Sequence, residues 1–311
     1  MLRVTETANW KSWMLRRNTG VIGWFAMSLF LWLDGRGWRI SGNMRLLLDL
    51  FQSANPLRRS ANPPEISIVV PFVRKDLDTL PYCVWGAVSS SMNPVRRVTL
   101  VTPARTIGES GLALDDIEAI ARSLLSAEFE SLEILIRLDE DLLGEGLSRQ
   151  IADRGLSPRY RGWCTQQLVK VLAAMQEDTS GALVVDSDTV LYFPRVWVDS
   201  HSKQLLLIGQ ECRDVPFDHS NSFLGIHSRP MLSFVTHHQL WQPTILKEIF
   251  PRGEVSVAEW LAYADPKEPE DQRGFKLNDY ETYGAYLSSA HPEKVRFATW
   301  GNGLGARDAL G

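Results

Sequence analysis

Two aspartates, Asp186 and Asp188, follow directly on the apolar run from Ala182 to Val185. A continuous apolar run of this length is typical of a strand buried on both faces of a parallel sheet, and ligands of such sheets bind beyond the carboxyl ends of the strands. Two carboxylates at that position suit Mg²⁺ or Mn²⁺, which also takes phosphate oxygens from a substrate. Because Asp-x-Asp also occurs by chance in solvated turns, the preceding strand gives the pair its significance.

Two chemistries are compatible with this pair. In the first, the aspartates hold a cation that bridges the diphosphate of a nucleotide-sugar and stabilises the departing nucleoside diphosphate. In the second, Asp186 attacks a phosphoryl group and Asp188 is a general acid. Residues 186–191 fit the haloacid-dehalogenase pattern for the second chemistry, but that pattern normally opens its domain, and we find no later acidic motif to complete it. Sugar transfer is therefore favoured, and a phosphatase is the alternative.

The segment from 161 to 172 predicts a helix that leads into this strand. Its sequence RGWCTQQLVKVL has a glycine near its start and apolar residues on one face. If the helix packs beside the strand, its polar side chains reach a pocket near the aspartates, and these are Arg161, Gln166, Gln167 and Lys170. Ordinary surface positions are the alternative for any one of them.

The region from 65 to 300 alternates between strand and helix patterns. Strands are predicted at 66–71, 98–101, 132–138, 204–208, 222–226 and 295–299, and helices at 77–90, 114–125, 230–235, 244–250, 257–264 and from Asn278 or Asp279 onward. The acidic segment 139–145 and the charged segment 266–272 are expected to be loops. Alternation of this kind predicts an α/β fold with a doubly wound, mostly parallel sheet and flanking helices.

The first sixty residues differ from the rest in composition. They contain nine Lys or Arg against three Asp or Glu, a net charge of +6, so the remainder of the chain carries −10. They also hold five of the eleven Trp and an apolar stretch from Val21 to Leu33. As a helix, that stretch spans about 20 Å, less than a bilayer core, so we predict a helical appendage that contacts a membrane peripherally through residues 10–51. A helix packed into the protein's own core or against a partner is the open alternative.

The composition as a whole excludes some classes of protein. With 311 residues and 44% hydrophobic residues, the chain is able to bury a sizeable core. The net charge of −4 argues against nucleic-acid binding, which needs a basic stripe. Cys83, Cys164 and Cys212 are scattered and lack metal-ligand spacing, which favours a reducing compartment such as the cytoplasm. Because the N-terminal residues are basic, we expect the protein at the cytoplasmic face of the membrane.

Several blocks together resemble a known family. These are ISIVVP followed by Asp76, then GWCTQQLVK, VVDSDTVLYFP and DYETYG, the last at residues 279–284. They resemble GT-A glycosyltransferases and, more narrowly, a group of bacterial glycosyltransferase-like proteins with Asp-x-Asp that is associated with surface-polysaccharide synthesis. The resemblance covers a catalytic domain at 65–300 and leaves 1–60 and a tail at 301–311 outside it. A non-catalytic subunit of a polysaccharide-assembly complex is the competing interpretation.

The resemblance implies a nucleotide-sugar donor and a glycan or lipid-linked acceptor. Asp76 is expected to contact the base or ribose of the donor. The sugar-diphosphate is expected to contact Gln166 and Lys170. Arg161 is added to the donor-binding residues because of its place at the start of the same predicted helix. Asp186 and Asp188 are expected to hold Mn²⁺ or Mg²⁺ together with the donor.

The acceptor side involves later residues. Glu281, with Asp279 as the second choice, is expected near the acceptor hydroxyl, where a carboxylate serves as general base if the hexosyl transfer is inverting. The stereochemistry itself stays open. A downstream histidine is expected as third metal ligand, and of His227, His237 and His238 we favour His238, since two adjacent rings on a strand point in opposite directions.

Overall fold

The computed structural model describes residues 62–209, 214–226, 233–262 and 277–300. The predictions for the N-terminal appendage, for the loop 266–272 and for the tail 301–311 lie outside these residues, and so do Cys212 and His227. In the described part of the chain, no helix combines the length and the apolar character needed to cross a bilayer.

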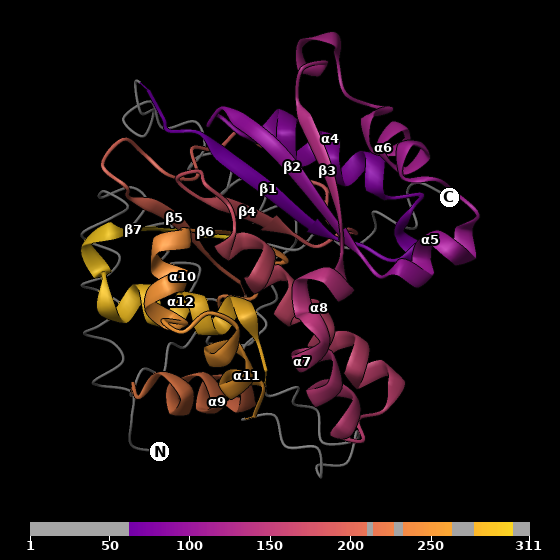
Figure 1. Ribbon diagram of the computed structural model, residues 1–311. Helices are drawn as coiled ribbons and strands as arrows, with labels where there is room; N and C mark the ends of the chain where they lie inside the picture. The colour runs from indigo at the N-terminus through magenta and orange to yellow at the C-terminus, as the bar shows by residue number, and fades with distance from the viewer. Residues whose placement is uncertain (1–61, 210–213, 227–232, 263–276, 301–311) are drawn as a thin grey trace, which may run out of the picture.

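The central sheet has five strands in the order β3-β2-β1-β4-β6. Their bounds are β1 Ile66–Pro71, β2 Val95–Thr102, β3 Glu133–Leu138, β4 Ala182–Val185 and β6 His238–Trp241. The first four run parallel to one another, and β6 pairs with β4 in the antiparallel direction (Figure 1). The chain leaves β1 toward β2 on one side and returns to β4 on the other, so the strand order reverses between β1 and β4.

Helices cover both faces of this sheet, as the apolar strands require. The helices are α4 Leu80–Ser90, α5 Ala104–Ser110, α6 Leu114–Arg122, α7 Asp139–Asp153, α8 Pro158–Met175, α9 Asp214–Leu224, α10 Pro243–Ile249, α11 Glu254–Ala262 and α12 Asp279–Ala290. Along β1, Ile68 and Val70 belong to the core under α4 and α6, while Val69 belongs to the core under α8. The predicted doubly wound, mostly parallel α/β fold with flanking helices is therefore confirmed.

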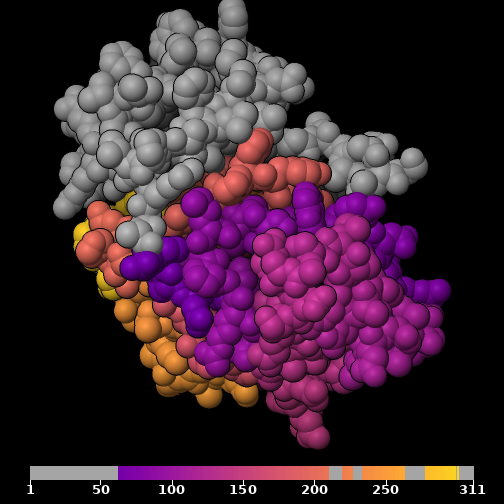
Figure 2. All heavy atoms as spheres, turned by 90° about the horizontal axis from the view of Figure 1, so that it is seen from above, coloured from indigo at the N-terminus to yellow at the C-terminus, as the bar shows by residue number. Residues whose placement is uncertain are grey.

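Two strands form a separate small sheet. Strand β5 (Gln204–Ile208) pairs in parallel with β7 (Val295–Thr299). Both strands match the sequence prediction, but their pairing joins segments far apart in the chain. In the space-filling view of Figure 2, the segments from β1 to α7, indigo to magenta, fill the centre and right of the visible face, and the orange C-terminal segments lie at its lower left.

Several segments differ from the sequence prediction. Of the helix predicted at 230–235, the described residues 233–235 are not helical, and Ser233 forms an antiparallel bridge with Gly209. The acidic stretch 139–145, expected as a loop, forms the start of α7, because acidic residues favour a helix N-terminus. Helix α7 is kinked at Gly144, which has a φ of 61°, and beyond the kink Leu147 and Ile151 are buried. The predicted strand 222–226 overlaps the end of α9. Strand β6 was not predicted, because four residues flanked by Thr236 and Pro243 give too short a pattern.

Gly284 in α12 occupies a position with no room for a side chain. A Cβ built there would lie 2.3 Å from Cγ of the Phe234 ring, which is itself buried. We therefore expect Gly284→Ala to lower the free energy of unfolding by about 1 to 3 kcal/mol, through overpacking of the core. Urea unfolding of the full chain measures this difference.

Gly146 in α7 is the matched control, because a Cβ built there meets nothing within 4 Å. Since alanine is the better helix former, Gly146→Ala should leave the protein unchanged or stabilise it by up to about 1 kcal/mol. Equal effects of the two substitutions would contradict the close contact with Phe234.

Candidate functional site

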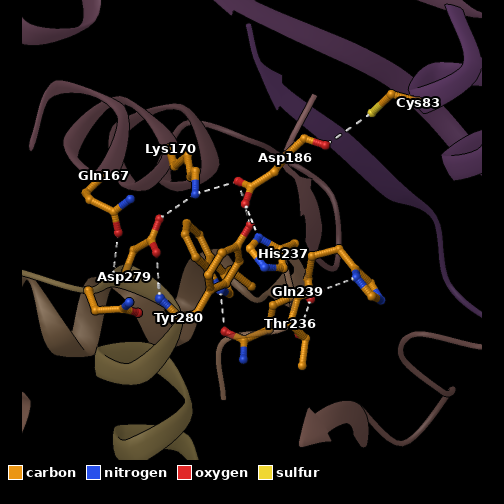
Figure 3. A network of polar contacts seen from close by, with 12 residues as sticks. Cys83, Gln167, Lys170, Asp186, Thr236, His237, Gln239, Asp279 and Tyr280 are labelled. Carbon is orange, nitrogen blue, oxygen red and sulfur yellow. Dashed lines mark hydrogen bonds and ion pairs between the residues drawn. The ribbon is translucent and has the colours of Figure 1, made fainter. Parts of the chain in front are cut away.

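A cluster of charged side chains lies at the carboxyl end of β4 (Figure 3). Lys170 Nζ from α8 lies 2.8 Å from Asp186 Oδ1 and 3.1 Å from Asp279 Oδ2. His237 Nδ1 lies 3.0 Å from Asp186 Oδ2. The structure thus brings together three of the predicted site residues, Lys170, Asp186 and Asp279, which come from a helix, a strand end and a second helix.

The local backbone explains how Asp186 reaches this cluster. The strand ends at Val185, and the Asp186 N–H donates to the carbonyl of His237 over 2.8 Å. The Asp186 carbonyl then accepts the N–H of Thr189 at 2.9 Å, so the chain turns at once. Asp188, two residues on, is exposed to solvent beyond the turn. The two aspartates of the motif therefore have different environments.

Lys170 is buried as an ion, with 1% of its side chain exposed. Burial alone favours a neutral amine, but the carboxylates of Asp186 and Asp279 outweigh it and raise the pKa of Lys170. Burial likewise opposes the charge on Asp186, yet Lys170 and His237 hold the pKa of Asp186 well below its usual range. For Asp279, burial prevails over Lys170 and raises its pKa to about 6. Lys170 and Asp186 therefore form the charged pair at the centre.

Two neutral side chains complete the cluster. The Tyr280 hydroxyl donates to Asp186 Oδ1 at 3.1 Å, and its ring lies under Lys170, with Nζ 4.4 Å from the ring centroid. Gln167 Oε1 accepts the N–H of Asp279 at 3.0 Å, so of the two adjacent glutamines Gln167 belongs to this cluster. Asn278, one of the two residues at which the sequence predicts this helix to begin, is the N-cap of α12, and its Oδ1 accepts the N–H of Glu281.

His237, and not His238, is the histidine at Asp186. His237 has a φ of 60°, which is uncommon for a residue other than glycine and turns its ring toward the strand end. Its side chain is 37% exposed. The sequence-based prediction of His238 is therefore wrong, because nothing in the residue types reveals the backbone conformation of His237.

His238 lies in the interior. Its Nδ1 is 2.8 Å from the carbonyl of Thr236, and its ring packs edge-on against Trp197 and Trp300. Burial, followed by the charge of Arg195, lowers the pKa of His238 to about 3, so the ring is neutral. A neutral ring bonded to a backbone carbonyl and enclosed by two indoles supports the structure of β6.

These placements do not fit the Mn²⁺ or Mg²⁺ site expected from Asp186, Asp188 and His238. The Asp186 carboxylate already contacts the Lys170 ammonium, the Tyr280 hydroxyl and the His237 ring, and these groups occupy the positions that a metal ion would need. The ring of His238 is turned into the core. Among the described residues, no group of three His, Cys, Asp or Glu side chains has the arrangement of a metal site. We therefore assign no step of the chemistry to a metal ion.

Glu281 is buried with 1% exposure at the start of α12. Its Oε1 accepts hydrogen bonds from the Ser233 hydroxyl and from the N–H of Phe234, the latter at 3.0 Å. Glu281 thereby fastens the segment before β6 to the helix. Its role as general base stays a prediction, and its placement favours a structural role instead. The same burial applies to Asp279, whose carboxylate faces Lys170.

A cavity of about 520 Å³ lies beyond the carboxyl ends of β1, β2 and β3. Of the predicted donor-binding residues, Asp76, Arg161 and Gln166 line it. Asp76 is 5% exposed and its Oδ2 accepts the N–H of Val73 at 3.2 Å, which fixes the turn after β1. Helix α8 begins at the cavity and carries Lys170 one turn beyond Gln166, so it connects the cavity with the charged cluster.

Basic side chains surround this cavity, and sequence reasoning missed most of them. They are Lys75, Arg105, Arg159 and Arg161. Only Arg161 was predicted, because it stands in the helix block before β4. The other three lie just after the predicted first and second strands or just before the helix block. Because residues that follow parallel strands meet at one edge of the sheet, where ligands bind, this placement could have identified them.

Comparison with known proteins gives matches among solved structures alone. Neither a protein-family model nor a curated protein sequence matches the chain. The galactosyltransferase LgtC, in complex with donor and acceptor sugar analogues, is 13% identical, with 75% of this chain and 73% of that chain covered and a TM-score of 0.40.

Two further solved structures show a similar degree of likeness. Glucosyl-3-phosphoglycerate synthase of M. tuberculosis is 12% identical, with 80% and 76% of the two chains covered and a TM-score of 0.38. The mannosyltransferase Ktr4p of S. cerevisiae is 8% identical, with 95% and 84% covered and a TM-score of 0.43. All three are glycosyltransferases of the GT-A type.

Proposed function

We propose that this protein is a glycosyltransferase that takes a sugar from a nucleotide-sugar donor. One observation carries the proposal: α8 joins a cavity lined by basic side chains to the Lys170–Asp186 pair at the end of β4. The strand order reverses between β1 and β4, and open α/β sheets bind their ligands at such a reversal, beyond the carboxyl ends of the strands. The sequence resemblance to GT-A enzymes supports the same function.

The cavity suits the nucleoside diphosphate of such a donor. Its volume of about 520 Å³ lies within the range of small-ligand pockets. Lys75, Arg105, Arg159 and Arg161 supply four positive charges for the phosphates. Helix α8 directs its N-terminus, which favours anions, toward the same space. The donor's sugar then lies along α8 toward Gln166 and the strand end.

The chemical step is the departure of the nucleoside diphosphate from the sugar as the acceptor hydroxyl attacks. Negative charge develops on the leaving diphosphate, and fixed positive groups around it lower the barrier. In this proposal the basic side chains of the cavity provide that compensation. The Lys170–Asp186 pair holds the end of β4 rigid, so that the exposed Asp188 has a fixed position beside the sugar.

The acceptor and the biological setting rest on the sequence resemblance alone. A glycan or lipid-linked acceptor, a role in bacterial surface-polysaccharide synthesis and a place at the cytoplasmic face of a membrane stay predictions. Hexosyl transfer and its stereochemistry belong to the same group. The phosphatase alternative would need the Asp186 carboxylate open to a phosphorus atom, whereas both of its oxygens are engaged by neighbouring side chains.

Binding and turnover of nucleotide-sugars test the proposal. The full-length protein is titrated with UDP- and GDP-sugars by calorimetry, with EDTA and with Mn²⁺, and release of nucleoside diphosphate is followed. We expect at least one donor to bind in EDTA, because side chains compensate the phosphate charge. Arg161→Ala should weaken that binding about tenfold or more, as expected for the loss of a hydrogen bond to a charged group.

Arg96→Ala is the matched control, because Arg96 lies 44% exposed at the opposite, amino-terminal end of β2. It should bind the donor like the wild type. Failure of every donor to bind under both conditions would refute the proposal. Binding without any release of nucleoside diphosphate, in the presence of a broad acceptor panel, would favour the non-catalytic subunit. A strict requirement for Mn²⁺ would contradict charge compensation by the side chains.

A further inference from the structure

Helix α4 lies against the main chain of the segment 186–195, which follows β4 and carries both aspartates of the motif. The Thr79 hydroxyl lies 3.2 Å from the carbonyl oxygen of Ser187, 108 positions away in the chain. One turn further along the helix, the Cys83 thiol donates to the carbonyl oxygen of Asp186 over 3.6 Å (Figure 3). Two side chains of α4 thus hold the turn of the Asp-x-Asp motif.

The same face of α4 makes two further contacts with this segment. Gly86 permits the closest one, because a Cβ built there would lie 2.8 Å from the nitrogen and 2.9 Å from the carbonyl oxygen of Leu191. At the end of the helix, the Ser90 carbonyl accepts the N–H of Arg195 at 2.8 Å. Because positions three and four apart lie on one face of a helix, all four contacts form one row along α4.

The Thr79 hydroxyl also connects this segment to the cavity. Thr79 is the N-cap residue of α4, yet its side chain makes no capping hydrogen bond to its own helix. Its oxygen instead lies 3.0 Å from the carbonyl oxygen of Asp76 and 3.2 Å from that of Ser187, so the two acceptors share a single hydroxyl proton. Since Asp76 lines the cavity, one side chain joins the turn after β1 to the turn after β4.

Helix α4 is itself fixed to the sheet. Leu80, Val84 and Ala87 are fully buried, in the same core as residues of β1 and β4. In the segment that the helix holds, by contrast, Asp188 is exposed and Tyr192 is 65% exposed. A segment whose main chain is held on a rigid element while its side chains face solvent is suited to presenting those side chains to a ligand.

We propose that Thr79 and Gly86 are positioning residues for sugar transfer. They fix the main chain that carries Asp188, and so they determine where this carboxylate stands relative to a donor in the cavity. Neither residue lines the cavity, so their effect is on the chemical step and not on donor binding. A misplacement of about 1 Å at a reacting centre lowers a rate by about a hundredfold. This inference rests on the proposed function and gives α4 a part in it.

Turnover and donor binding, measured separately, test this inference. Full-length Gly86→Ala and wild type are compared for release of nucleoside diphosphate, using the UDP- or GDP-sugar with the highest wild-type turnover and a broad acceptor panel, and for donor affinity by calorimetry. Because the added methyl group meets main-chain atoms of Leu191, the segment must shift. We expect kcat to fall about ten- to a hundredfold and the donor Kd to change by less than about twofold.

Gly108→Ala on α5 is the matched control for the added methyl group. A Cβ built at Gly108 meets nothing within 4 Å, and the residue is exposed. This variant should have the kcat and the donor Kd of the wild type.

Thr79→Val tests the hydroxyl while nearly preserving the size of the side chain. It should lower kcat about tenfold, as expected for the loss of one hydrogen bond, and leave the donor Kd close to the wild-type value. Thr79→Ser retains the hydroxyl and should restore kcat. Thr244→Val, at an exposed position of α10, is the control for the substitution itself and should behave like the wild type.

The outcomes separate this inference from the proposed function. Wild-type kcat in both Gly86→Ala and Thr79→Val would overturn the role of α4 and leave the proposed function standing. A loss of donor affinity that accounts for the loss of turnover, or a Thr79→Ser variant as slow as Thr79→Val, would overturn it as well. Wild-type protein that releases no nucleoside diphosphate would refute transfer, and the inference with it. Thermal unfolding of each variant shows that the rates are compared on folded protein.

Discussion

Replacing Lys170 by methionine is expected to lower the free energy of unfolding by about 3 to 5 kcal/mol at pH 8, the range measured when one partner of a buried ion pair is removed. Methionine fills nearly the same volume and keeps the contact with the Tyr280 ring, so the loss is electrostatic. Without the ammonium, Asp186 and Asp279 face each other in the interior, and no other cation is within bonding distance of Asp279 among the described residues.

The pH dependence of this loss has a definite sign. In the variant, both carboxylates lack Lys170, so their pKa values in the folded protein rise, that of Asp279 from its present value of about 6. A folded state with a raised carboxyl pKa binds protons more readily than the unfolded state, and it is stabilised as pH falls. The deficit of Lys170→Met should therefore shrink between pH 8 and pH 5. Urea unfolding at both pH values measures it.

Two further variants make this result specific. Lys247 on α10 is exposed, and Lys247→Met should change the stability by less than about 0.5 kcal/mol. Adding Asp279→Asn to Lys170→Met removes one of the opposed carboxylates and should recover part of the loss. A small, pH-independent loss in Lys170→Met would show that the buried pair is not ionised.

His238→Phe is expected to be less stable than the wild type at pH 7 and more stable than the wild type at pH 4. At pH 7 the variant loses the hydrogen bond to the Thr236 carbonyl and should be about 1 kcal/mol less stable. In acid, the wild type is at a disadvantage, because its buried ring has a pKa of about 3 whereas an unfolded histidine has 6.5. Between these values the unfolded state binds more protons, so wild-type stability falls as pH falls, by up to about 5 kcal/mol at pH 3.

Phenylalanine has no proton to bind in the unfolded state, so the variant does not show the acid-dependent loss of stability that His238 causes in the wild type. The difference between wild type and variant, measured by urea unfolding at several pH values, isolates His238, because the other titrating groups contribute to both proteins. The exposed His201 provides the control, and His201→Phe should show no such crossing. Parallel stability curves for wild type and His238→Phe would mean that the ring titrates normally and is not enclosed by Trp197 and Trp300.

The sequence predicted best where a pattern is local. The buried strands β1 and β4 and the helix before β4 follow from hydrophobic periodicity, and the position of Lys170 near Asp186 follows from them. Residue type alone places the N-cap of α12 at Asn278 or Asp279, and the structure shows that it is Asn278. The pairing of β5 with β7 was beyond such reasoning, because no local pattern specifies a partner far away in the chain.

The side chains of the site show the same limit. His237 and His238 are chemically identical neighbours, and only the positive φ of His237 decides which one meets Asp186. Asp279 and Glu281 are two residues apart on one helix, so they face different directions, and the sequence does not give the rotation of that helix about its axis. Asp139 was assigned to a loop because three acidic residues at the start of α7 concealed the apolar side of that helix.

The bond from the Asp279 N–H to Gln167 joins positions 112 residues apart, and this separation determines the order in which the site is assembled during synthesis. A chain emerging from the ribosome exposes α8 and β4 well before α12 has been made. Until then, Lys170 and Asp186 have each other but lack the carboxylate and the phenol that enclose them in the finished protein. Completion of the charged cluster is therefore a late event in folding during synthesis, because it requires α12.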